Sequence, residues 1–323
     1  MSRVNTQNKL VVILGPTASG KTDLSIKLAK KFNGEVVSAD SRQVYRGMDI
    51  GSGKVTKKEM RGIPHYLLDV ANPKRKFTVA QYQKLALAAI KKIQGKNKLP
   101  ILVGGTGFYI QSIVDGIIIP EVKPDWKLRK ELEKKSNEQL FQMLLKKDPE
   151  RAKTIDKQNP RRLIRAVEIV LTTGKPVPAL SSVVIPAKAG IQNAGINNDM
   201  DSRFRGNDNI LQLGIKISQD QLKNNIKKRL LKRLKNNAMI NEVKKLRKSG
   251  LSWKRLEEFG LEYKFVAQYI QNKILHQQML DKIQIESEHY AKRQMTWFKR
   301  DKRIHWIDSY KEANNLIDKF LQK

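Results

Sequence analysis

The chain of 323 residues contains no cysteine, and it has fewer than half as many acidic as basic residues. Without cysteine, disulfide frameworks and thiolate metal sites are excluded. Long hydrophobic runs are also lacking. The apolar run at residues 10–14 is shorter than the core of a signal peptide, and nothing approaches the length of a membrane span. We therefore expect a cytoplasmic monomer that does not bind membranes.

Positive charge is what the chain has in excess. Lys and Arg total 64 against 31 Asp and Glu, which gives a formal net charge of +33. Such a field attracts polyanions and speeds their association. Part of the excess can be lysine on solvated faces, but basic residues become denser in the C-terminal half, where aromatic residues alternate with them. We therefore favour a nucleic-acid partner.

One motif near the N-terminus predicts a phosphate-binding loop. The segment GPTASGKT matches Gly-x-x-x-x-Gly-Lys-[Ser/Thr] at every defined position. It follows a predicted buried strand at 10–14 and precedes residues 23–32, whose period of 3.6 predicts a helix. The loop's N–H groups would bind an anion, Lys21 would add a positive charge, and Thr22 could ligate Mg²⁺. A nucleoside triphosphate is the default ligand, although any diphosphate ester meets the same geometry. The predicted binding residues are Gly15, Pro16, Thr17, Ala18, Ser19, Gly20, Lys21 and Thr22.

Residues 1–115 alternate between strand-like and helix-like segments, as in a parallel sheet covered by helices on both faces. The later predicted strands are residues 35–39, 64–70, 99–103 and 211–217. Residues 78–94 predict an amphipathic helix with Thr78 as its N-cap, and the glycine-rich turn 104–107 leads into another helix. The predicted fold is therefore α/β, with a parallel sheet core like that of P-loop NTPases.

The remaining regions differ in character. Residues 116–180 are charged and predicted to be helical, chiefly from 126 to 172, where a Gly/Pro stop follows. Residues 181–210 lack periodicity, and the two ends of 183–209 resemble translated mobile palindromic repeats. We expect a surface insertion without a catalytic role there rather than an RNA-binding arm. Residues 211–323 return to the core with one strand, and they continue as basic helices from residue 219.

A carboxylate and an unusual segment follow the second predicted strand. Asp40 ends that strand, where P-loop enzymes need an acid for Mg²⁺. Residues 44–51 combine aromatic, thioether, basic and glycine side chains. This mixture suits a flat ring near the phosphate site as well as it suits metal ligation. The residues alone leave open whether Asp40 is a general base, a Mg²⁺ ligand or a strand-end cap.

Several sequence blocks together resemble the tRNA dimethylallyltransferases, the IPP transferase family. The blocks are GPTASGKT, SADSRQVYRGMDIGSGK, PHYLLDV, LPILVGGTGFYI, NPRRLIRAVEI, GLEYK and YAKRQMTWF. They occur in order over nearly the whole chain, except at 183–209. The resemblance implies transfer of a dimethylallyl group from dimethylallyl diphosphate to the N6 amine of the adenosine 3′-adjacent to the anticodon, with release of diphosphate. It also implies that 116–180 form a tRNA-binding insertion and that the partner is the anticodon stem-loop.

The resemblance implies roles for individual residues. The loop, Lys21, Mg²⁺ and Arg229 would stabilise the leaving diphosphate, although the basic neighbours of Arg229 compete for its role. Asp40 would take the proton of the amine, and Thr106 would bind a substrate or cap the next helix. The target base must leave its stack, and Gln43 could read its edge. The implied tRNA contacts are Asp40, Ser41, Arg42, Gln43, Thr106, Arg129, Arg161, Arg162, Leu163, Ile164 and Arg165.

Three alternatives are open at this point. A prenyltransferase for free adenine nucleotides would not need the arginines of 161–165 or the basic C-terminal helices. A P-loop kinase that uses ATP does not explain why Asp40–Gln43 occur together with the turn 104–107. A non-catalytic RNA-binding protein has no need of an intact phosphate loop. Residues 161–165 could also be a solvated basic face, and for Trp297 and Phe298 we favour core packing over base stacking.

Overall fold

A computed structural model describes residues 8–117, 122, 124–177 and 209–323. They fall into two compact units, one formed by the described parts of 1–114 and 190–323 and the other by those of 115–189. The expected insertion at 183–209 lies outside the described residues, apart from Asn209. No helix in the described ranges is both long and apolar enough to cross a membrane.

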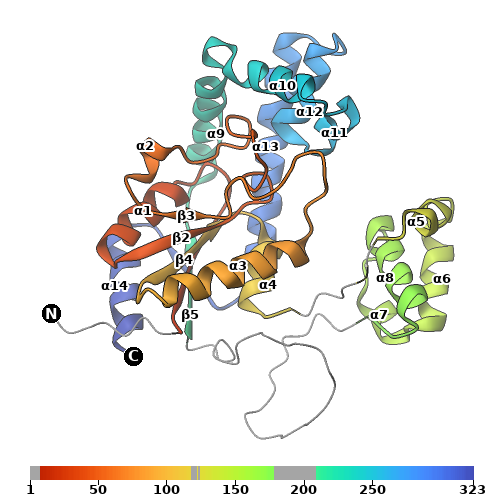
Figure 1. The fold of residues 1–323 in the computed structure, drawn as a ribbon, viewed down its shortest axis with the longest axis horizontal. Helices are drawn as coiled ribbons and strands as arrows, with labels where there is room; N and C mark the ends of the chain where they lie inside the picture. Colours follow the sequence, from red (N-terminus) through yellow and green to blue (C-terminus); the bar gives the residue numbers. More distant parts are fainter. Residues whose placement is uncertain (1–7, 118–121, 123, 178–208) are drawn as a thin grey trace, which may run out of the picture. The chain divides into compact units, whose positions relative to one another are not determined.

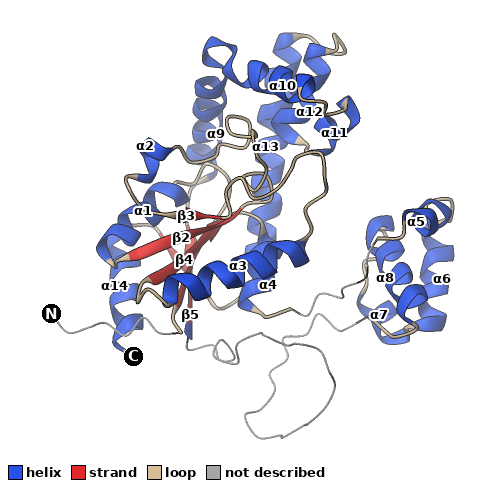
Figure 2. Cartoon of the chain, in the orientation of Figure 1, coloured by secondary structure: helices blue, strands red, loops and turns tan. Residues whose placement is uncertain are grey.

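A parallel sheet of six strands forms the centre of the first unit, in the order β3-β2-β4-β1-β5-β6 (Figures 1 and 2). The strands are β1 (Leu10–Leu14), β2 (Gly34–Ala39), β3 (His65–Tyr66), β4 (Leu99–Gly104), β5 (Ile210–Ile215) and β6 (Ile304–Ile307). The inner strands are short apolar runs because helices cover both faces of the sheet.

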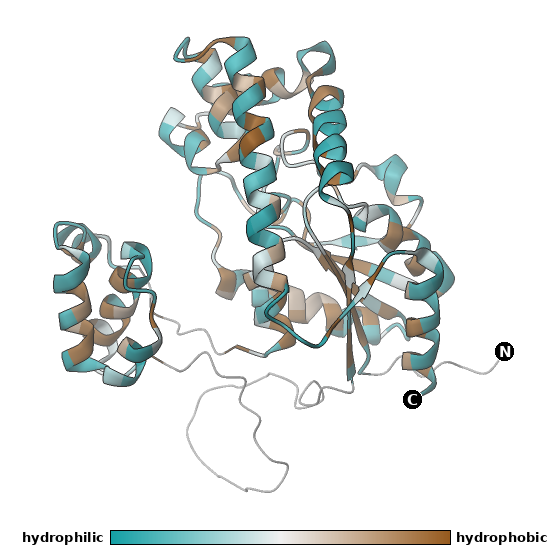
Figure 3. Ribbon diagram, turned by 180° about the vertical axis from the view of Figure 1, so that it is seen from behind, coloured by the Kyte–Doolittle hydropathy of each residue, from teal (hydrophilic) through white to brown (hydrophobic). Residues whose placement is uncertain are grey.

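Helices of this unit cover both faces of the sheet. The helices are α1 (Lys21–Lys31), α2 (Lys57–Met60), α3 (Val79–Gln94), α4 (Gly107–Val114), α9 (Gln219–Leu234), η3 (Lys235–Asn237), α10 (Ala238–Lys248), α11 (Trp253–Glu258), α12 (Leu261–Ile270), α13 (His276–Phe298) and α14 (Tyr310–Gln322). Of these, α10, α11 and α12 extend beyond the sheet (Figure 1). Leu10, Val12 and Leu14 join the core formed with α3, α4 and α13, whereas Val11 and Ile13 join the core formed with α1 and α14. The strands are accordingly hydrophobic, and the outer helix faces are largely hydrophilic (Figure 3).

The register of the strands brings three segments to one edge of the sheet. Leu14 of β1 and Ala39 of β2 are both paired with Gly104 of β4. The residues that follow, Gly15 and Asp40 among them, therefore leave the sheet at the same level. Ligands of open α/β sheets bind at this carboxyl edge.

The second unit is a small helical bundle. Its helices are α5 (Trp126–Leu132), α6 (Asn137–Lys147), α7 (Pro149–Thr154) and α8 (Pro160–Thr173). Leucine, isoleucine and valine side chains of α6 and α8 form most of its own core. Gly174 ends α8 in the left-handed region, with φ of +66°, where glycine is favoured.

Most predicted elements are confirmed within two residues, including the Thr78 cap, which forms a capping box with Gln81. Two predictions are wrong. The strand expected at 64–70 is only His65–Tyr66, because Leu67 and Asp69 turn the chain with φ of +64° and +58°. The region after residue 219 is not entirely helical, since Ile304–Ile307 add β6 to the sheet edge.

Candidate active site

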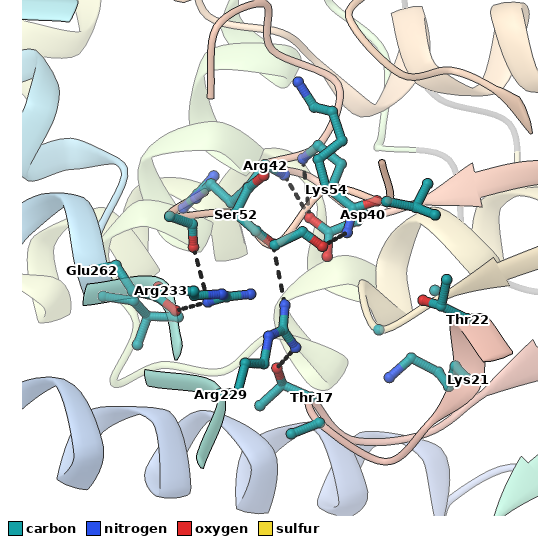
Figure 4. Close-up of a pocket in the computed structure, with 18 of the residues that line it drawn as sticks. Thr17, Lys21, Thr22, Asp40, Arg42, Ser52, Lys54, Arg229, Arg233 and Glu262 are labelled. Carbon is teal, nitrogen blue, oxygen red and sulfur yellow. Dashed lines mark hydrogen bonds and ion pairs between the residues drawn. The ribbon is translucent and has the colours of Figure 1, made fainter. Parts of the chain in front are cut away.

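A cleft of about 1080 Å³ opens at the carboxyl edge of the sheet in the first unit. The predicted phosphate loop, the end of β2, the turn after β4, and residues of α9 and α13 line it. Figure 4 shows that side chains from the loop, from the segment after β2 and from α9 point toward one another across this cleft. The structure thus brings together segments that are about 200 residues apart in the sequence.

The phosphate loop turns sharply and contains a buried hydroxyl group. Ala18 and Gly20 have φ of +59° and +87°, which turns the loop sharply before α1 begins. The Ser19 hydroxyl is buried and has no hydrogen-bond partner among the described residues. A buried hydroxyl without a partner is costly, and a phosphate oxygen would satisfy it. The loop therefore fits an oxyanion.

Two cations lie close together beside the loop. The Lys21 Nζ donates to the carbonyl of Pro16 at 2.5 Å, and the Arg229 Nη1 donates to the Thr17 hydroxyl at 3.2 Å. Burial, followed by the charge on Arg229, lowers the pKa of Lys21 to about 7, although the charge on Asp40 opposes both. Burial, followed by the charge on Arg233, lowers the pKa of Arg229 to about 10. A bound polyanion would offset this crowding of positive charge.

Of the neighbouring basic residues, Arg229 is the one that reaches the loop. Its Nη2 also donates to the carbonyl of Ser52 at 3.4 Å. Arg233 instead donates from Nη1 to Glu262 at 2.8 Å and to the carbonyl of Gly51 at 3.2 Å (Figure 4). Glu262 thus neutralises Arg233 and leaves the charge of Arg229 available at the loop.

Gly53 allows the two arginines to approach the backbone. A Cβ at this position would overlap the guanidinium groups of both Arg229 and Arg233, and the glycine has a φ of +62°. Any other residue would therefore push the arginines away and strain the turn. This glycine is part of the site geometry.

Asp40 lines the same cleft, and one of its carboxylate oxygens accepts hydrogen bonds from the backbone. Its Oδ1 accepts the backbone N–H groups of Arg42 at 2.7 Å and of Gln43 at 3.2 Å. This local turn fixes the carboxylate and leaves Oδ2 for a substrate. The Arg42 and Gln43 side chains are held by protein groups. Arg42 donates to the carbonyl of Phe259 at 2.7 Å, and Gln43 donates to that of Gly53 at 3.2 Å.

Thr106 lies beside this carboxylate because its turn follows β4. Its hydroxyl accepts the backbone N–H of Ser41 at 3.0 Å, and a side-chain hydrogen bond joins it to Tyr290. Burial, followed by the charge of Asp40, raises the pKa of Tyr290 to about 12. The phenol is therefore protonated at neutral pH and can donate. Asp40 and Tyr290 line the cleft, and Thr106 is joined to the residue after Asp40 and to Tyr290.

Sequence reasoning missed two residues that shape the site. Glu242 of α10 accepts the backbone N–H groups of residues 49–51 at 2.6–3.0 Å and the Tyr263 hydroxyl at 2.8 Å. It thereby fixes the backbone next to the carbonyl groups to which Arg229 and Arg233 donate. Gln294 of α13 accepts the N–H of Thr17 at 2.8 Å. The backbone N–H groups that these two side chains accept lie more than 190 residues earlier in the chain, so no local pattern marks either residue.

The remaining predicted contacts lie in the second unit. Glu168 is fully buried and accepts two bonds from Arg129, at 2.8 and 2.7 Å, and one from Arg165 at 2.6 Å. These arginine bonds lower the pKa of the carboxyl, although burial opposes them. Arg161 and Arg162 are exposed, whereas Leu163 and Ile164 pack in the core. The unit thus presents arginine side chains, two of which are fixed by one carboxylate.

Comparisons with known proteins find one family, and its members match this chain over nearly its full length. The model of the IPP transferase family matches residues 43–301. The tRNA dimethylallyltransferase of Carboxydothermus hydrogenoformans is 39% identical over 319 residues, which cover 98% of this chain and 96% of that protein. The crystal structure of the full-length tRNA isopentenylpyrophosphate transferase from Bacillus halodurans has a TM-score of 0.68 at 34% identity, covering 98% of this chain and 97% of that one. A eukaryotic dimethylallyltransferase acting on tRNA has a TM-score of 0.73 at 26% identity, covering 93% and 73%.

Proposed function

Because this chain belongs to the IPP transferase family, we propose that it transfers a dimethylallyl group from dimethylallyl diphosphate to an adenosine of tRNA. One observation of the structure supports this most strongly. A phosphate loop and a fixed carboxylate, Asp40, leave adjacent parts of one sheet edge and line one cleft. A donor diphosphate and an acceptor amine can therefore meet there.

The phosphate loop would bind the leaving half of the donor. As the C–O bond between the allyl group and the diphosphate breaks, its electron pair passes to the diphosphate oxygen. Lys21 and Arg229 line the cleft at the loop, so little reorganisation would be needed when the charge develops. The unpaired Ser19 hydroxyl adds a further donor.

Asp40 would act as the general base for the acceptor. The adenine N6 lone pair forms the new C–N bond, and the amine then loses a proton to Oδ2 of Asp40. Oδ1 holds the carboxylate still by accepting two backbone N–H groups. The Thr106 hydroxyl, fixed by Ser41 and Tyr290, lies where it can hydrogen-bond a substrate.

The donor set fits Mg²⁺ bound together with a diphosphate. No group of three His, Asp or Glu side chains forms a metal cage in the described part of the chain. Thr22 stands in the first turn of α1 beside the loop, and Mg²⁺ commonly takes most of its ligands from substrate phosphates and water. When bound through Thr22, the ion would supply further positive charge at the departing diphosphate.

The RNA partner would be an anticodon stem-loop. The net charge of +33 favours such a polyanion, and Arg129, Arg161, Arg162 and Arg165 of the second unit offer guanidinium groups to phosphates. The target adenosine, on the 3′ side of the anticodon, must leave its stack to reach the cleft. This reading accounts for the basic helices, which a prenyltransferase of free nucleotides would not need.

A transfer assay with two donors tests the proposal. The protein is incubated with an anticodon stem-loop that carries consecutive adenosines, and with either labelled dimethylallyl diphosphate or γ-labelled ATP. We expect label in the RNA from the first donor alone. A stem-loop in which guanosines replace these adenosines is the control and should stay unlabelled. Label from ATP, or none from the diphosphate, would contradict the proposed function.

A further inference from the structure

One face of α13 contacts three successive residues, 105–107, of the turn that carries Thr106. Tyr290, Gln294 and Trp297 are spaced at i, i+4 and i+7, so they lie on the same face of the helix. Tyr290 is hydrogen-bonded to Thr106, Gln294 to the carbonyl of Gly105, and the Trp297 indole packs where a Cβ of Gly107 would lie. The turn is thus held from one side by a single helix.

Gln294 does more than hold the turn. Its Nε2 donates to the carbonyl of Gly105 at 2.8 Å, while its Oε1 accepts the N–H of Thr17 at 2.8 Å. Only 6% of the residue is exposed, so water does not compete for either bond. One side-chain amide therefore joins the phosphate loop to the turn after β4.

The two ends of this bridge lead to the two substrate positions. The Thr17 hydroxyl accepts from Arg229, which belongs to the diphosphate side of the cleft. Gly105 precedes Thr106, whose hydroxyl accepts the N–H of Ser41, the residue after Asp40. Gly105 itself has no room for a side chain, because a Cβ would overlap the Gln294 amide. The close approach of helix and turn is therefore built around this glutamine.

We propose that Gln294 is a positioning residue that fixes the phosphate loop and the Thr106 turn at one separation, so that the donor carbon faces the acceptor amine. This inference rests on the proposed prenyl transfer. An amide suits the task because it donates at one end and accepts at the other, which a carboxylate, hydroxyl or amine cannot do in these two places. Misplacing reacting groups by about 1 Å can slow a reaction by ~10²-fold.

Single-turnover kinetics of Gln294→Met test this role. Methionine has nearly the same length but makes neither hydrogen bond. With saturating dimethylallyl diphosphate and stem-loop RNA, we expect the transfer rate to fall by about 10–100-fold, while the Kd of each substrate stays within about threefold. The control is Gln284→Met on the same helix, whose side chain bonds Lys223 and Glu288 away from the cleft. Its rate should equal that of the wild type.

A second variant and a double variant separate positioning from a loss of folding. Gln294→Asn keeps a buried amide but is one methylene too short for both partners, so it should be slow as well. Because Gln294 positions the Thr106 turn as well as the loop, the loss of rate in the double variant Gln294→Met/Thr106→Ala should be smaller than the two single losses combined. Thermal melting checks that each variant is folded.

The outcomes are distinct. Wild-type rates in a folded Gln294→Met variant, fully additive losses in the double variant, or weaker substrate binding with an unchanged rate would each overturn the positioning role. A wild-type protein that transfers no label to RNA would instead overturn the proposed function itself.

Discussion

Lys21 should take up a proton when the donor diphosphate binds. In the free protein, burial and the neighbouring Arg229 lower its pKa to about 7. At pH 8, only about one tenth of the protein then carries a charged Lys21. A diphosphate against this side chain favours the ammonium form and returns the pKa toward the ordinary value of 10.5 or above. Binding at pH 8 should therefore take up about 0.9 proton, and at pH 6 only about 0.1.

The sign of this linkage also sets the pH dependence of affinity. Because the complex binds more protons than the free protein, the diphosphate should bind tightest below pH 7. Its Kd should rise by up to about tenfold per pH unit from 7 to 9. The trend contrasts with that of an ordinary surface lysine, which stays charged throughout this range.

Titration calorimetry measures the uptake directly. Dimethylallyl diphosphate is titrated into the protein at pH 8 in buffers of different ionisation enthalpy, and the slope gives the protons exchanged. Lys21→Arg is the matched control, since an arginine stays charged and leaves only the protons of the ligand and other groups. We expect the wild type to take up about 0.9 proton more than the variant. Equal uptake by both proteins would refute the assignment of Lys21 to the diphosphate.

Three further predictions concern other parts of the first unit. Asp40→Asn should lower kcat by about 10²–10⁴-fold, with stem-loop affinity in a filter-binding assay unchanged, and a lost affinity would assign Asp40 to recognition instead. Gly53→Ala should displace Arg229 and raise the Kd of dimethylallyl diphosphate in calorimetry, since its Cβ overlaps the guanidinium, and an unchanged Kd would contradict this packing. Bonds from Lys98, Tyr66 and Lys96 lower the pKa of Glu35 from 4.5 to about 2, although burial opposes them. Stability from this carboxylate is therefore present above pH 4.5 and lost toward pH 2. In urea unfolding, the free energy of unfolding of Glu35→Gln should fall less between pH 4.5 and pH 2 than that of the wild type, by on the order of 1 kcal/mol. Identical pH profiles of the two proteins would contradict this.

The sequence predicted well those features that depend on neighbouring residues. The strand before the phosphate loop, the next strand after it and the Thr78 cap are short-range patterns, and the structure reproduces them. The late strand, Ile210–Ile215, was recognisable as an apolar run and pairs with β1. By contrast, β6 has only four residues and lies between helices, so the segment is too short for an alternating pattern to be recognised.

The geometry of the site depends on long-range contacts that no local pattern encodes. Glu242 binds backbone N–H groups about 190 residues earlier, and Gln294 reaches a turn 189 residues earlier. The sequence could not decide between Arg229 and its basic neighbours. In the folded chain Arg229 donates to Thr17 of the loop whereas Arg233 pairs with Glu262, which favours Arg229 for that role. A resemblance to known sequences locates such residues, but only the contacts say what they do.

The most direct measurement is a crystal structure of the protein with an unreactive thio analogue of dimethylallyl diphosphate and a stem-loop RNA. We predict that the diphosphate lies within the loop Gly15–Thr22 and contacts Arg229, and that the adenosine N6 lies within hydrogen-bonding distance of Oδ2 of Asp40. A diphosphate bound outside this loop, or an adenosine N6 distant from Asp40, would contradict the account.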